Sequence, residues 1–539
     1  MGLHGGNILG ADVSKSGAAT FRAYDPASNR ELDTAFHEAT EAEAAKALEM
    51  ANAAHASYRA QPPEAIANLL DQIASGLEQA GDELLARAHL ETRLPQARLI
   101  YERNRTTAQL RMFAALVREG SWVDARIDLA DPARTPIPQP DLRRMLVSLG
   151  PVVVFGASNF PLAFSICGGD TASALAAGNP VVAKAHPAHP GTSEIAARVI
   201  QEAIRKNAMP PGVFSMVQGA RPELGLALVR HPATRAVGFT GSLVAGRALL
   251  DAAAARPSPI PFFAEMGSLN PVFILPGALK AQPSELAQRL AGSVTLGVGQ
   301  MCTKPGQIAA IKSPELDLLV QKLADFTACT PLSAMLYSGI AERYRDGLLQ
   351  RSQLAGVRFA TAAVPNDTEI LGGATVSAAV LVSDAPSFFK NSTLSQELFG
   401  PATLVTECES RQHLEEIARR LEGQLTVTIH ATEEDLREYA SLISVLREKA
   451  GRMIFGGVPT GVEVKPAMHH GGPYPATTDP RFTSVGPAAI LRFARPVRYQ
   501  DCPQPWLPPE LKDENPRSIF RLVNGEWTRA AVPALASMH

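Results

Sequence analysis

The strongest constraint on the fold of this chain is a regular alternation of apolar runs and helix-like stretches between residues 151 and 255. Short apolar runs, several rich in β-branched residues, are each followed by a segment of helical composition. The predicted strands are 151–156, 180–184, 213–219 and 236–241, and the predicted helices are 164–178, 191–206, 222–231 and 242–255. Strands joined through helices form a parallel sheet covered on both faces, so we expect an α/β fold with a doubly wound, nucleotide-binding type of domain.

The rest of the 539 residues is long enough for one or two further domains. Residues 38–118 are rich in Ala, Leu, Glu and Arg and predict helices. A second α/β region spans 267–465, and a late strand is predicted within 488–500. Its predicted strands lie near 270–275, 307–311, 402–407 and 425–430.

Three domains are therefore predicted. Residues 1–130 and 151–266 would bind a dinucleotide, and 267–465 would form a second, catalytic α/β domain. The Pro-rich segment 131–150 and residues 480–510 would form a small β arm that pairs with another subunit. A homodimer or homotetramer is the expected assembly.

Composition excludes several classes of protein. A net charge of -2 with scattered Lys and Arg does not favour nucleic acid or an acidic membrane surface. The N-terminus lacks the pattern of a secretory signal, and the most apolar stretch, 145–167, is interrupted by Gly, Pro, Ser and Asn. The cysteines are few, odd in number and widely spaced, which argues against a disulfide framework or a metal site and favours a cytoplasmic protein. They are Cys167, Cys302, Cys329, Cys408 and Cys502.

Several common catalytic and nucleotide-binding motifs are missing. The chain has no G-x-x-x-x-G-K-[ST], no H-E-x-x-H and no G-x-S-x-G. The turn after the first strand of the alternation reads GASNFP (156–161), without the G-x-G-x-x-G of many dinucleotide-binding proteins. A dinucleotide would have to be bound in another way.

Cys302 is the candidate nucleophile. It lies in VTLGVGQMCTKPGQ (294–307), among glycines that let backbone approach a ligand closely. A thiolate is a strong nucleophile, and the hemithioacetal that it forms with an aldehyde is a good hydride donor. The alternative, a small buried apolar cysteine, fits the other four cysteines better.

Glu265 is the candidate base. In FFAEMGSLNP (262–271) it stands between an apolar run and a Gly-Ser turn. Partial desolvation there is expected to raise the carboxyl pKa towards neutral, which suits a general base for the thiol or for water. The alternative is a structural carboxylate paired with a buried amide or an arginine.

Two further segments complete the set. Asn159 follows the carboxyl end of the first strand of the alternation, where its amide can donate to a developing oxyanion. SQELFGPATLV (395–405) places an acidic residue, an aromatic residue and Gly-Pro before a strand. Taken alone, Asn159 is better explained as a turn residue that satisfies its own backbone. The alternative for SQELFGPATLV is a plain turn before a strand.

The order of these segments resembles the aldehyde dehydrogenase superfamily. The shared pattern runs from Asn-Phe-Pro after a strand, through a Lys that ends the next strand, to Phe-Thr-Gly-Ser, Glu-x-Gly-x-x-Asn-Pro, Gly-Gln-x-Cys and Glu-x-Phe-Gly-Pro. The resemblance implies that Cys302 attacks an aldehyde, that Asn159 and the Cys302 N–H hold the oxyanion, and that Glu265 activates the water that hydrolyses a thioester.

The resemblance also implies a binding site for the cofactor. Lys184 would bind the adenosine ribose or its phosphate, and Gly241 and Ser242 would approach the pyrophosphate at a helix start. Glu397 would hold the nicotinamide ribose, with Phe399 beside it. The further positions expected at the cofactor are Ala157, Ser158 and Gly246.

Two departures from the family pattern suggest a divergent branch that prefers NADP, with NAD also possible. Many relatives that prefer NAD have a Glu three residues after the lysine, whereas Pro187 stands there in KAHPAHPGTSE. A 2′-phosphate would meet less repulsion, and Lys184 and His186 would assist it. Ala157-Ser158 replaces the usual Pro-Trp before Asn-Phe-Pro.

Segments such as GQMCTKPGQ, PTGVEV and HGGPYPATTDPRFTSVG resemble the 2-oxoglutarate semialdehyde dehydrogenase group. That likeness implies oxidation of 2,5-dioxopentanoate to 2-oxoglutarate. HGGPYPATTDPR (470–481), with Arg481, would lie near the substrate mouth or a subunit contact, or form a plain surface loop. Three alternatives remain: an NADP-dependent dehydrogenase of long-chain aldehydes, a CoA-acylating dehydrogenase, and a catalytically silent binding or structural protein of the same fold.

Overall fold

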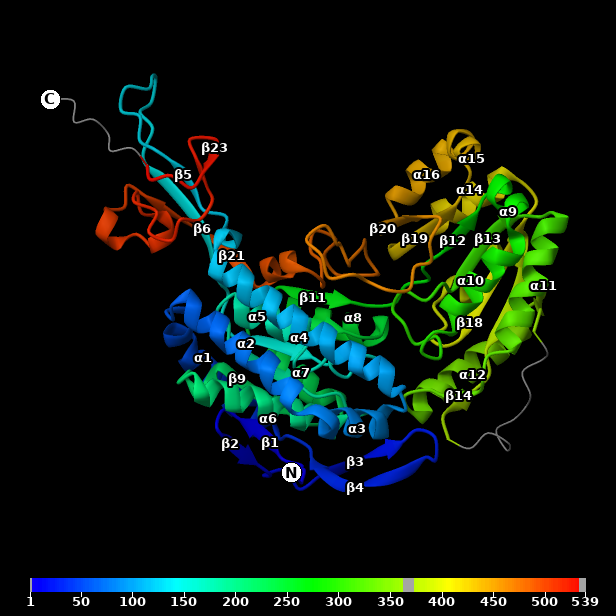
Figure 1. Cartoon of the computed structure of the whole chain (residues 1–539), viewed down its shortest axis with the longest axis horizontal. Helices are drawn as coiled ribbons and strands as arrows, with labels where there is room; N and C mark the ends of the chain where they lie inside the picture. Colours follow the sequence, from blue (N-terminus) through cyan, green and yellow to red (C-terminus); the bar gives the residue numbers. More distant parts are fainter. Residues whose placement is uncertain (1, 362–372, 533–539) are drawn as a thin grey trace.

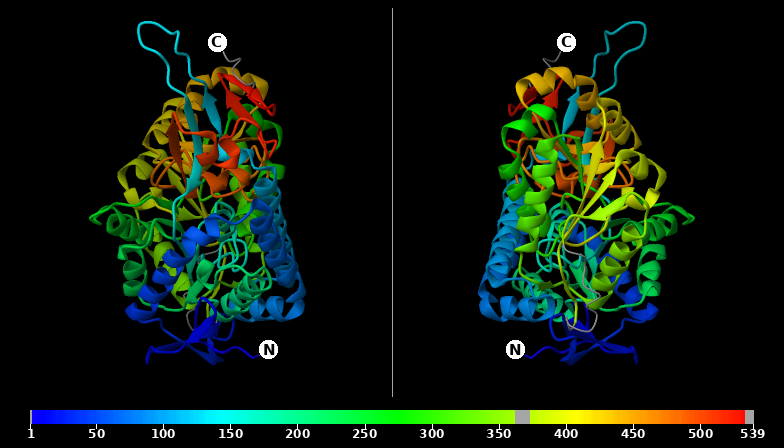
Figure 2. Two further views of the ribbon diagram at one scale, coloured as in Figure 1. Left: turned by 90° about the vertical axis from the view of Figure 1, so that its left-hand side faces the viewer. Right: turned by 90° about the vertical axis from the view of Figure 1, so that its right-hand side faces the viewer.

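The computed structural model describes residues 2–361 and 373–532. Figure 1 shows two α/β units side by side and a β arm that projects away from the first of them. In the two views of Figure 2 the units lie one behind the other, and a hairpin of the arm projects beyond the body of the molecule. None of the helices in the described ranges combines the length and the apolar character needed to cross a membrane.

The first unit contains a seven-stranded sheet in the order β11-β10-β7-β8-β9-β1-β2. Strands β7 to β11 are parallel, and β1 and β2 extend the sheet in antiparallel fashion. The strands are β1 (Asn7–Leu9), β2 (Asp12–Ser14), β7 (Val152–Phe155), β8 (Val181–Lys184), β9 (Phe214–Val217), β10 (Ala236–Thr240) and β11 (Phe262–Glu265). The chain reverses direction across the sheet between β7 and β10, and ligands of such sheets bind at the carboxyl ends of the strands at this switch point.

Alternate residues of these strands face two different cores, which confirms the doubly wound type. Val152 and Val154 pack with α2, α4, α5 and α6, whereas Val153 and Phe155 pack with α1, α7 and α8. The helices of this unit are α1 (Glu41–Arg59), α2 (Pro63–Gln79), α3 (Gly81–Thr92), α4 (Gln96–Glu119), α5 (Gly169–Ala176), α6 (Pro190–Lys206), α7 (Pro222–Arg230) and α8 (Leu243–Ala254).

The second unit repeats this design. Its sheet has the order β15-β17-β18-β13-β12-β19-β20, and every pair except β15-β17 is parallel. One face packs on α9, α10 and α11, and the other on α12, α13, α14 and α16.

The strands of the second sheet are β12 (Val272–Ile274), β13 (Gln307–Ile311), β15 (Val357–Phe359), β17 (Ala379–Asp384), β18 (Ala402–Cys408), β19 (Gln424–His430) and β20 (Ala450–Phe455). The helices are α9 (Pro276–Ala281), α10 (Pro283–Thr295), α11 (Pro314–Ala328), α12 (Ser338–Ser352), α13 (Ala385–Lys390), α14 (Arg411–Arg420), α15 (Glu433–Glu438) and α16 (Ala440–Arg447). Two small ribbons, β3-β4 (Thr20–Asp25 with Arg30–His37) and β14-β16 (Ser333–Ala334 with Thr375–Val376), lie outside the main sheets.

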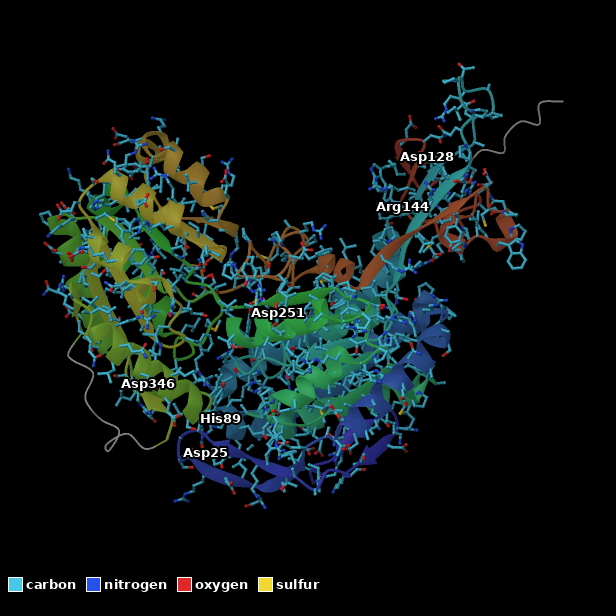
Figure 3. All side chains as sticks on the ribbon, turned by 180° about the vertical axis from the view of Figure 1, so that it is seen from behind. Asp25, His89, Asp128, Arg144, Asp251 and Asp346 are labelled. Atoms are coloured by element: carbon cyan, nitrogen blue, oxygen red, sulfur yellow. The ribbon has the colours of Figure 1, made fainter. Side chains whose placement is uncertain are left out.

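The arm is a five-stranded sheet in the order β21-β6-β5-β22-β23. Asp128 of β5 and Arg144 of β6 mark it in Figure 3. It includes strands outside the predicted arm segments, because β5 pairs with β6 and β22 pairs with β5. The strands are β5 (Arg126–Asp128), β6 (Leu142–Ser148), β21 (Ala494–Gln500), β22 (Arg521–Val523) and β23 (Glu526–Thr528). A pairing of this arm with another subunit stays a prediction.

Two predicted elements begin later than expected. The helix predicted from 164 begins at Gly169, because the chain folds back on itself and Gly168 packs against the Ala163 carbonyl, 2.3 Å from where a Cβ would stand. The strand predicted within 488–500 begins at Ala494, since Pro487 starts a turn of 3₁₀ helix that runs to Phe493.

Candidate active site

Cys302 lies in the loop between α10 and β13, on the side of the second unit that faces the first sheet. In the same loop, three to five positions before Cys302, Gly297, Val298 and Gly299 have φ angles of 60°, 58° and 63°. A β-branched residue such as Val298 rarely adopts this conformation. A Cβ on Gly299 would lie 2.3 Å from the carbonyl carbon of Gly400. The loop therefore needs glycine at this point, where it packs directly on the backbone.

Two buried side chains that the sequence does not predict fix this loop. The Nδ2 of Asn270 donates to the carbonyl oxygens of Cys302 at 2.8 Å and Lys304 at 3.1 Å. The Nζ of Lys304 donates to the carbonyl oxygens of Leu398 at 2.9 Å and Ala402 at 2.8 Å. Burial lowers the pKa of Lys304 to about 8. These bonds tie the nucleophile loop to the segment that precedes β18.

Asn159 reaches the same loop from the carboxyl end of β7. Its side chain is buried, and Nδ2 donates to the carbonyl oxygen of Gln300 at 3.0 Å. Arg98 donates to the Asn159 carbonyl oxygen at 2.6 Å and fixes the backbone there. The amide thus stands beside the nucleophile loop, as an oxyanion donor must, although that role stays a prediction.

The Cys302 thiol also lies within reach of a histidine that was not predicted. Its Sγ is 3.6 Å from the Nε2 of His470, and that nitrogen is 3.1 Å from the Oε1 of Glu265. The three groups lie within 4.8 Å of one another, and His470 and Glu265 are nearly fully buried. A thiol, an imidazole and a carboxylate in contact can transfer a proton among themselves.

His470 reaches the site because the segment after it lies along the edge of β11. The N–H of Met266 donates to the Ala476 carbonyl oxygen at 2.8 Å, and the N–H of Thr478 donates to the Ala264 carbonyl oxygen at 3.2 Å. This pairing places the 470–484 segment against the strand that ends at Glu265. Arg481, for which a substrate mouth, a subunit contact and a plain surface loop were all considered, is exposed and paired with Asp479.

The pKa values of the two reactive groups, Cys302 and Glu265, are shifted in opposite directions. Burial and then the Glu265 charge raise the pKa of the Cys302 thiol well above its ordinary value. Burial acts to raise the Glu265 pKa as well and is the largest single influence. His470 and the Ser484 hydroxyl, which donates to Oε2 at 3.0 Å, together outweigh it. The pKa of Glu265 is therefore below its ordinary value, and the predicted rise towards neutral is wrong. The sequence could not show the two partners that stabilise the charged carboxylate.

The residues predicted at the pyrophosphate meet at the carboxyl end of the first sheet. Gly241 and Ser242 follow β10, and the Ser242 hydroxyl caps α8 by accepting from the Ala245 N–H. The first turn of α8 is exposed, as an anion site at a helix start requires. Gly246 is buried, and a Cβ there would lie 2.6 Å from the Met266 sulfur, so a larger residue would require the Met266 side chain to move.

The residues predicted at the adenosine end surround the carboxyl ends of β7 and β8. Lys184 ends β8, and burial lowers its pKa to about 8. Burial and the nearby cations lower the pKa of His186 well below its ordinary value, so its imidazole is neutral at pH 7 and offers a hydrogen bond rather than the charge expected for a phosphate partner. Ala157 is buried, with its carbonyl oxygen accepting from His189 at 2.8 Å, and Ser158 beside it is half-buried.

Glu397 and Phe399 belong to the second unit, in the segment that precedes β18. A Cβ on Gly267 would lie 2.7 Å from the Oε2 of Glu397, so the carboxylate lies against the turn that follows Glu265. Burial raises the pKa of Glu397 to about 7, against the opposing attraction of Lys304. Phe399 is half-buried against the second core.

Comparison with known proteins agrees with this arrangement. The family model described as "Aldehyde dehydrogenase family" matches residues 13–472. The chain belongs to the aldehyde dehydrogenase family. It is therefore an oxidoreductase of small aldehydes in a family that uses NAD or NADP.

Two relatives match nearly end to end. Alpha-ketoglutaric semialdehyde dehydrogenase 2 of Azospirillum brasilense is 48% identical over 527 residues, which cover 98% of this chain and 100% of that protein. Alpha-ketoglutaric semialdehyde dehydrogenase of Acinetobacter baylyi is 46% identical over 92% of this chain and 93% of its own length. Among solved structures, lactaldehyde dehydrogenase of Escherichia coli is 20% identical with a TM-score of 0.78, and it covers 92% of this chain and 98% of its own. This last likeness shows the fold.

Proposed function

We propose that this aldehyde dehydrogenase oxidises 2-oxoglutarate semialdehyde to 2-oxoglutarate through a thioester on Cys302, with NADP preferred. The substrate rests on the similarity over nearly the whole chain to the two relatives named for it. The chemistry rests on one observation, the contact of the Cys302 sulfur with His470 and, through it, with Glu265.

The first step needs a base. Because burial and the Glu265 charge hold the pKa of Cys302 well above its ordinary value, the thiol keeps its proton at neutral pH. Attack on the aldehyde carbon therefore requires that the proton leave as the C–S bond forms. His470 Nε2, 3.6 Å from the sulfur, receives this proton, and the Glu265 carboxylate stabilises the imidazolium that results. Asn159 and the Cys302 N–H donate to the oxyanion.

The second step ends at the same carboxylate. NADP, when bound, supplies the acceptor for the hydride that leaves the hemithioacetal carbon, and the acyl group remains on Cys302 as a thioester. After His470 has released its proton to solvent, Glu265 takes a proton from water, whose oxygen attacks the thioester. That proton then passes to the departing sulfur, so the acid leaves and the thiol re-forms. Because its pKa is low, Glu265 is ionised and ready to accept that proton at neutral pH.

The side chains at the carboxyl ends of the first sheet match the chemistry of a dinucleotide phosphate. The exposed start of α8 suits a pyrophosphate, and the ammonium of Lys184 suits a phosphate on the adenosine ribose. Glu397 can accept from the hydroxyls of the nicotinamide ribose.

Replacing His470 with glutamine tests its part in the first step. The glutamine side chain would keep a polar group of similar length but could not accept the thiol proton, so kcat is expected to fall by about 10²-fold. The pH dependence of Cys302 alkylation by iodoacetamide should move to higher pH in the same variant. A fall in kcat with an unchanged alkylation profile would mean that His470 only supports the local structure.

The preference for NADP can be tested at Lys184. Pro187 leaves no carboxylate three residues beyond it, so wild-type kcat/KM is expected to be higher with NADP than with NAD. Lys184→Met should raise KM for NADP by about tenfold or more and change KM for NAD much less. Higher efficiency of the wild type with NAD would contradict the proposal.

The substrate can be tested by comparing kcat/KM for 2,5-dioxopentanoate and for long-chain aliphatic aldehydes, with NADP in excess. We expect a clearly higher kcat/KM for 2,5-dioxopentanoate. Higher efficiency with long-chain aldehydes would favour that alternative, and product formation that depends on CoA would favour an acylating enzyme. Absence of turnover over a broad panel of aldehydes would favour a silent member of the family.

The arm is proposed to form the subunit contact of a homodimer or homotetramer. Among the described residues, its edge strands β21 and β23 are each paired on one side only, and large apolar side chains are exposed around the arm. They include Ile137, Trp506, Phe520 and Trp527. The variant Trp506→Asp/Trp527→Asp is expected to lower the mass measured by light scattering to that of a smaller assembly. Tyr101→Asp, an exposed site on α4, is the control, and an unchanged mass in the arm variant would contradict the assignment.

The cysteines support a reducing compartment, and a cytoplasmic location is proposed. All five are free in the structure. Cys167 and Cys408 are buried, and burial raises the pKa of each to about 12, so neither is reactive.

A further inference from the structure

The contact of Cys302, His470 and Glu265 has the composition of a transition-metal site. The three ligand atoms, Sγ, Nε2 and a carboxylate oxygen, come from segments that are far apart in the sequence and lie within 4.8 Å of one another. Sulfur, imidazole nitrogen and carboxylate oxygen are the three ligand types that Zn²⁺ takes from proteins. Because the sequence lacks the spacing of a metal-binding motif, no metal site was predicted from it.

The distances fit a tetrahedral ion closely at two of the three edges. With bonds of about 2.3 Å to sulfur and about 2.0–2.1 Å to nitrogen and oxygen, tetrahedral ligands lie about 3.3–3.6 Å apart. The Sγ of Cys302 is 3.6 Å from Nε2 of His470, and that nitrogen is 3.1 Å from Oε1 of Glu265. The sulfur and the carboxylate oxygen, at most 4.8 Å apart, need to approach by no more than about 1.2 Å, which a side-chain rotation provides.

The surroundings favour a divalent cation over separate charges. His470 and Glu265 are 2% and 4% exposed, so a thiolate and a carboxylate side by side would repel each other in a medium of low dielectric. One Zn²⁺ balances both negative charges. The Ser484 hydroxyl donates to the other oxygen of Glu265 at 3.0 Å, which orients the carboxylate as outer-shell partners of metal sites do.

We propose that Cys302, His470 and Glu265 form a zinc-binding site that reversibly inhibits the enzyme. On binding, the Zn–S bond forms as the thiol proton passes to bulk water, and no electrons are transferred. The bound sulfur no longer attacks an aldehyde, and the imidazole and the carboxylate no longer accept protons. Hard cations such as Mg²⁺, which require oxygen ligands, do not bind here. Only the inhibition rests on the proposed function, because the binding needs the three ligands alone.

The full-length protein without cofactor is titrated with zinc chloride and, separately, with cobalt chloride. We expect one equivalent of Zn²⁺ to be retained in equilibrium dialysis and to block alkylation of Cys302 by iodoacetamide, as read by mass spectrometry, with reversal by EDTA. Co²⁺ is expected to give the thiolate charge-transfer band and the visible bands of a tetrahedral site. Magnesium chloride should change none of these signals.

Variants assign the ligands without any measurement of turnover. Cys302→Ala and His470→Gln should each weaken retention of Zn²⁺ at least tenfold, and Cys329→Ser, at an exposed cysteine outside the site, should leave it unchanged. Circular dichroism shows whether each variant is folded. If Cys302→Ala or His470→Gln is not folded, Glu265→Gln replaces it as a ligand variant. Retention of zinc that persists in the Cys302 and His470 variants, or cobalt spectra without a thiolate band, would overturn the proposal. If the protein binds zinc but oxidises no aldehyde, the proposal of a zinc site stands and the proposed function is rejected.

Discussion

Replacing Cys302 with alanine is expected to lower kcat by on the order of 10⁴-fold or more, because no other group can carry the acyl intermediate. The substitution removes the sulfur but leaves the loop intact, since Asn270 bonds to the backbone oxygen of residue 302 and not to its side chain. Binding of NADP should therefore remain within a few-fold of the wild type. Steady-state kinetics and fluorescence titration of the cofactor measure the two quantities.

Cys329→Ala is the matched control, because that thiol is exposed and lies at the end of α11, away from the site. It is expected to keep full activity. Substantial turnover by Cys302→Ala would show that the nucleophile has been assigned to the wrong residue. Loss of cofactor binding in that variant would show that the loop had collapsed.

Replacing Glu265 with glutamine is expected to slow hydrolysis of the thioester by about 10²–10⁴-fold, because an amide cannot accept the proton of water. The first turnover should still release reduced cofactor, so a burst of about one equivalent per site is expected, followed by a slow steady state. Rapid-quench mass spectrometry should detect the acyl group on Cys302.

Ser484→Ala distinguishes the effect of how Glu265 is oriented from the effect of its carboxylate as a base. It removes the hydrogen bond to Oε2 but leaves the carboxylate, so the fall in kcat should be several-fold at most. Glu285→Gln, on the exposed side of α10, should have no effect. If Glu265→Gln kept full steady-state turnover without a burst, the base would have to be sought elsewhere, and His470 would be the next candidate.

The main features of the fold could be predicted because both sheets follow local rules. Runs such as PVVVFG and PVVAK are short, apolar and β-branched, and the helices between them have the length and composition that a crossover needs. The arm was predicted less fully. Strands β5, β22 and β23 are only three residues long, and their pairing depends on distant partners that no local pattern shows.

Residues of the active site could be predicted only where they stand in a recognisable sequence motif. Cys302, Glu265 and Asn159 stand in short motifs with a recognisable order, and the structure brings the first two together with His470 and the third to Gln300. His470 is the second of two adjacent histidines in a segment rich in Gly and Pro, so nothing local distinguishes it from a surface residue. The direction of the Glu265 pKa was wrong for the same reason, since its main partner is 205 residues away along the chain.

The buried Lys304 also limits how such an enzyme can be redesigned. Its ammonium group joins the loop of the nucleophile to the carbonyl oxygens on either side of Phe399, and the Gly299–Gly400 contact leaves no room between the two segments. The backbone segments that carry Cys302 and Glu397 are therefore held against each other. Insertions or bulky replacements in 297–304 or 397–402 would change both segments at once. Variation of substrate range is better directed at 456–468, where the chain runs from β20 towards His470 without helix or strand.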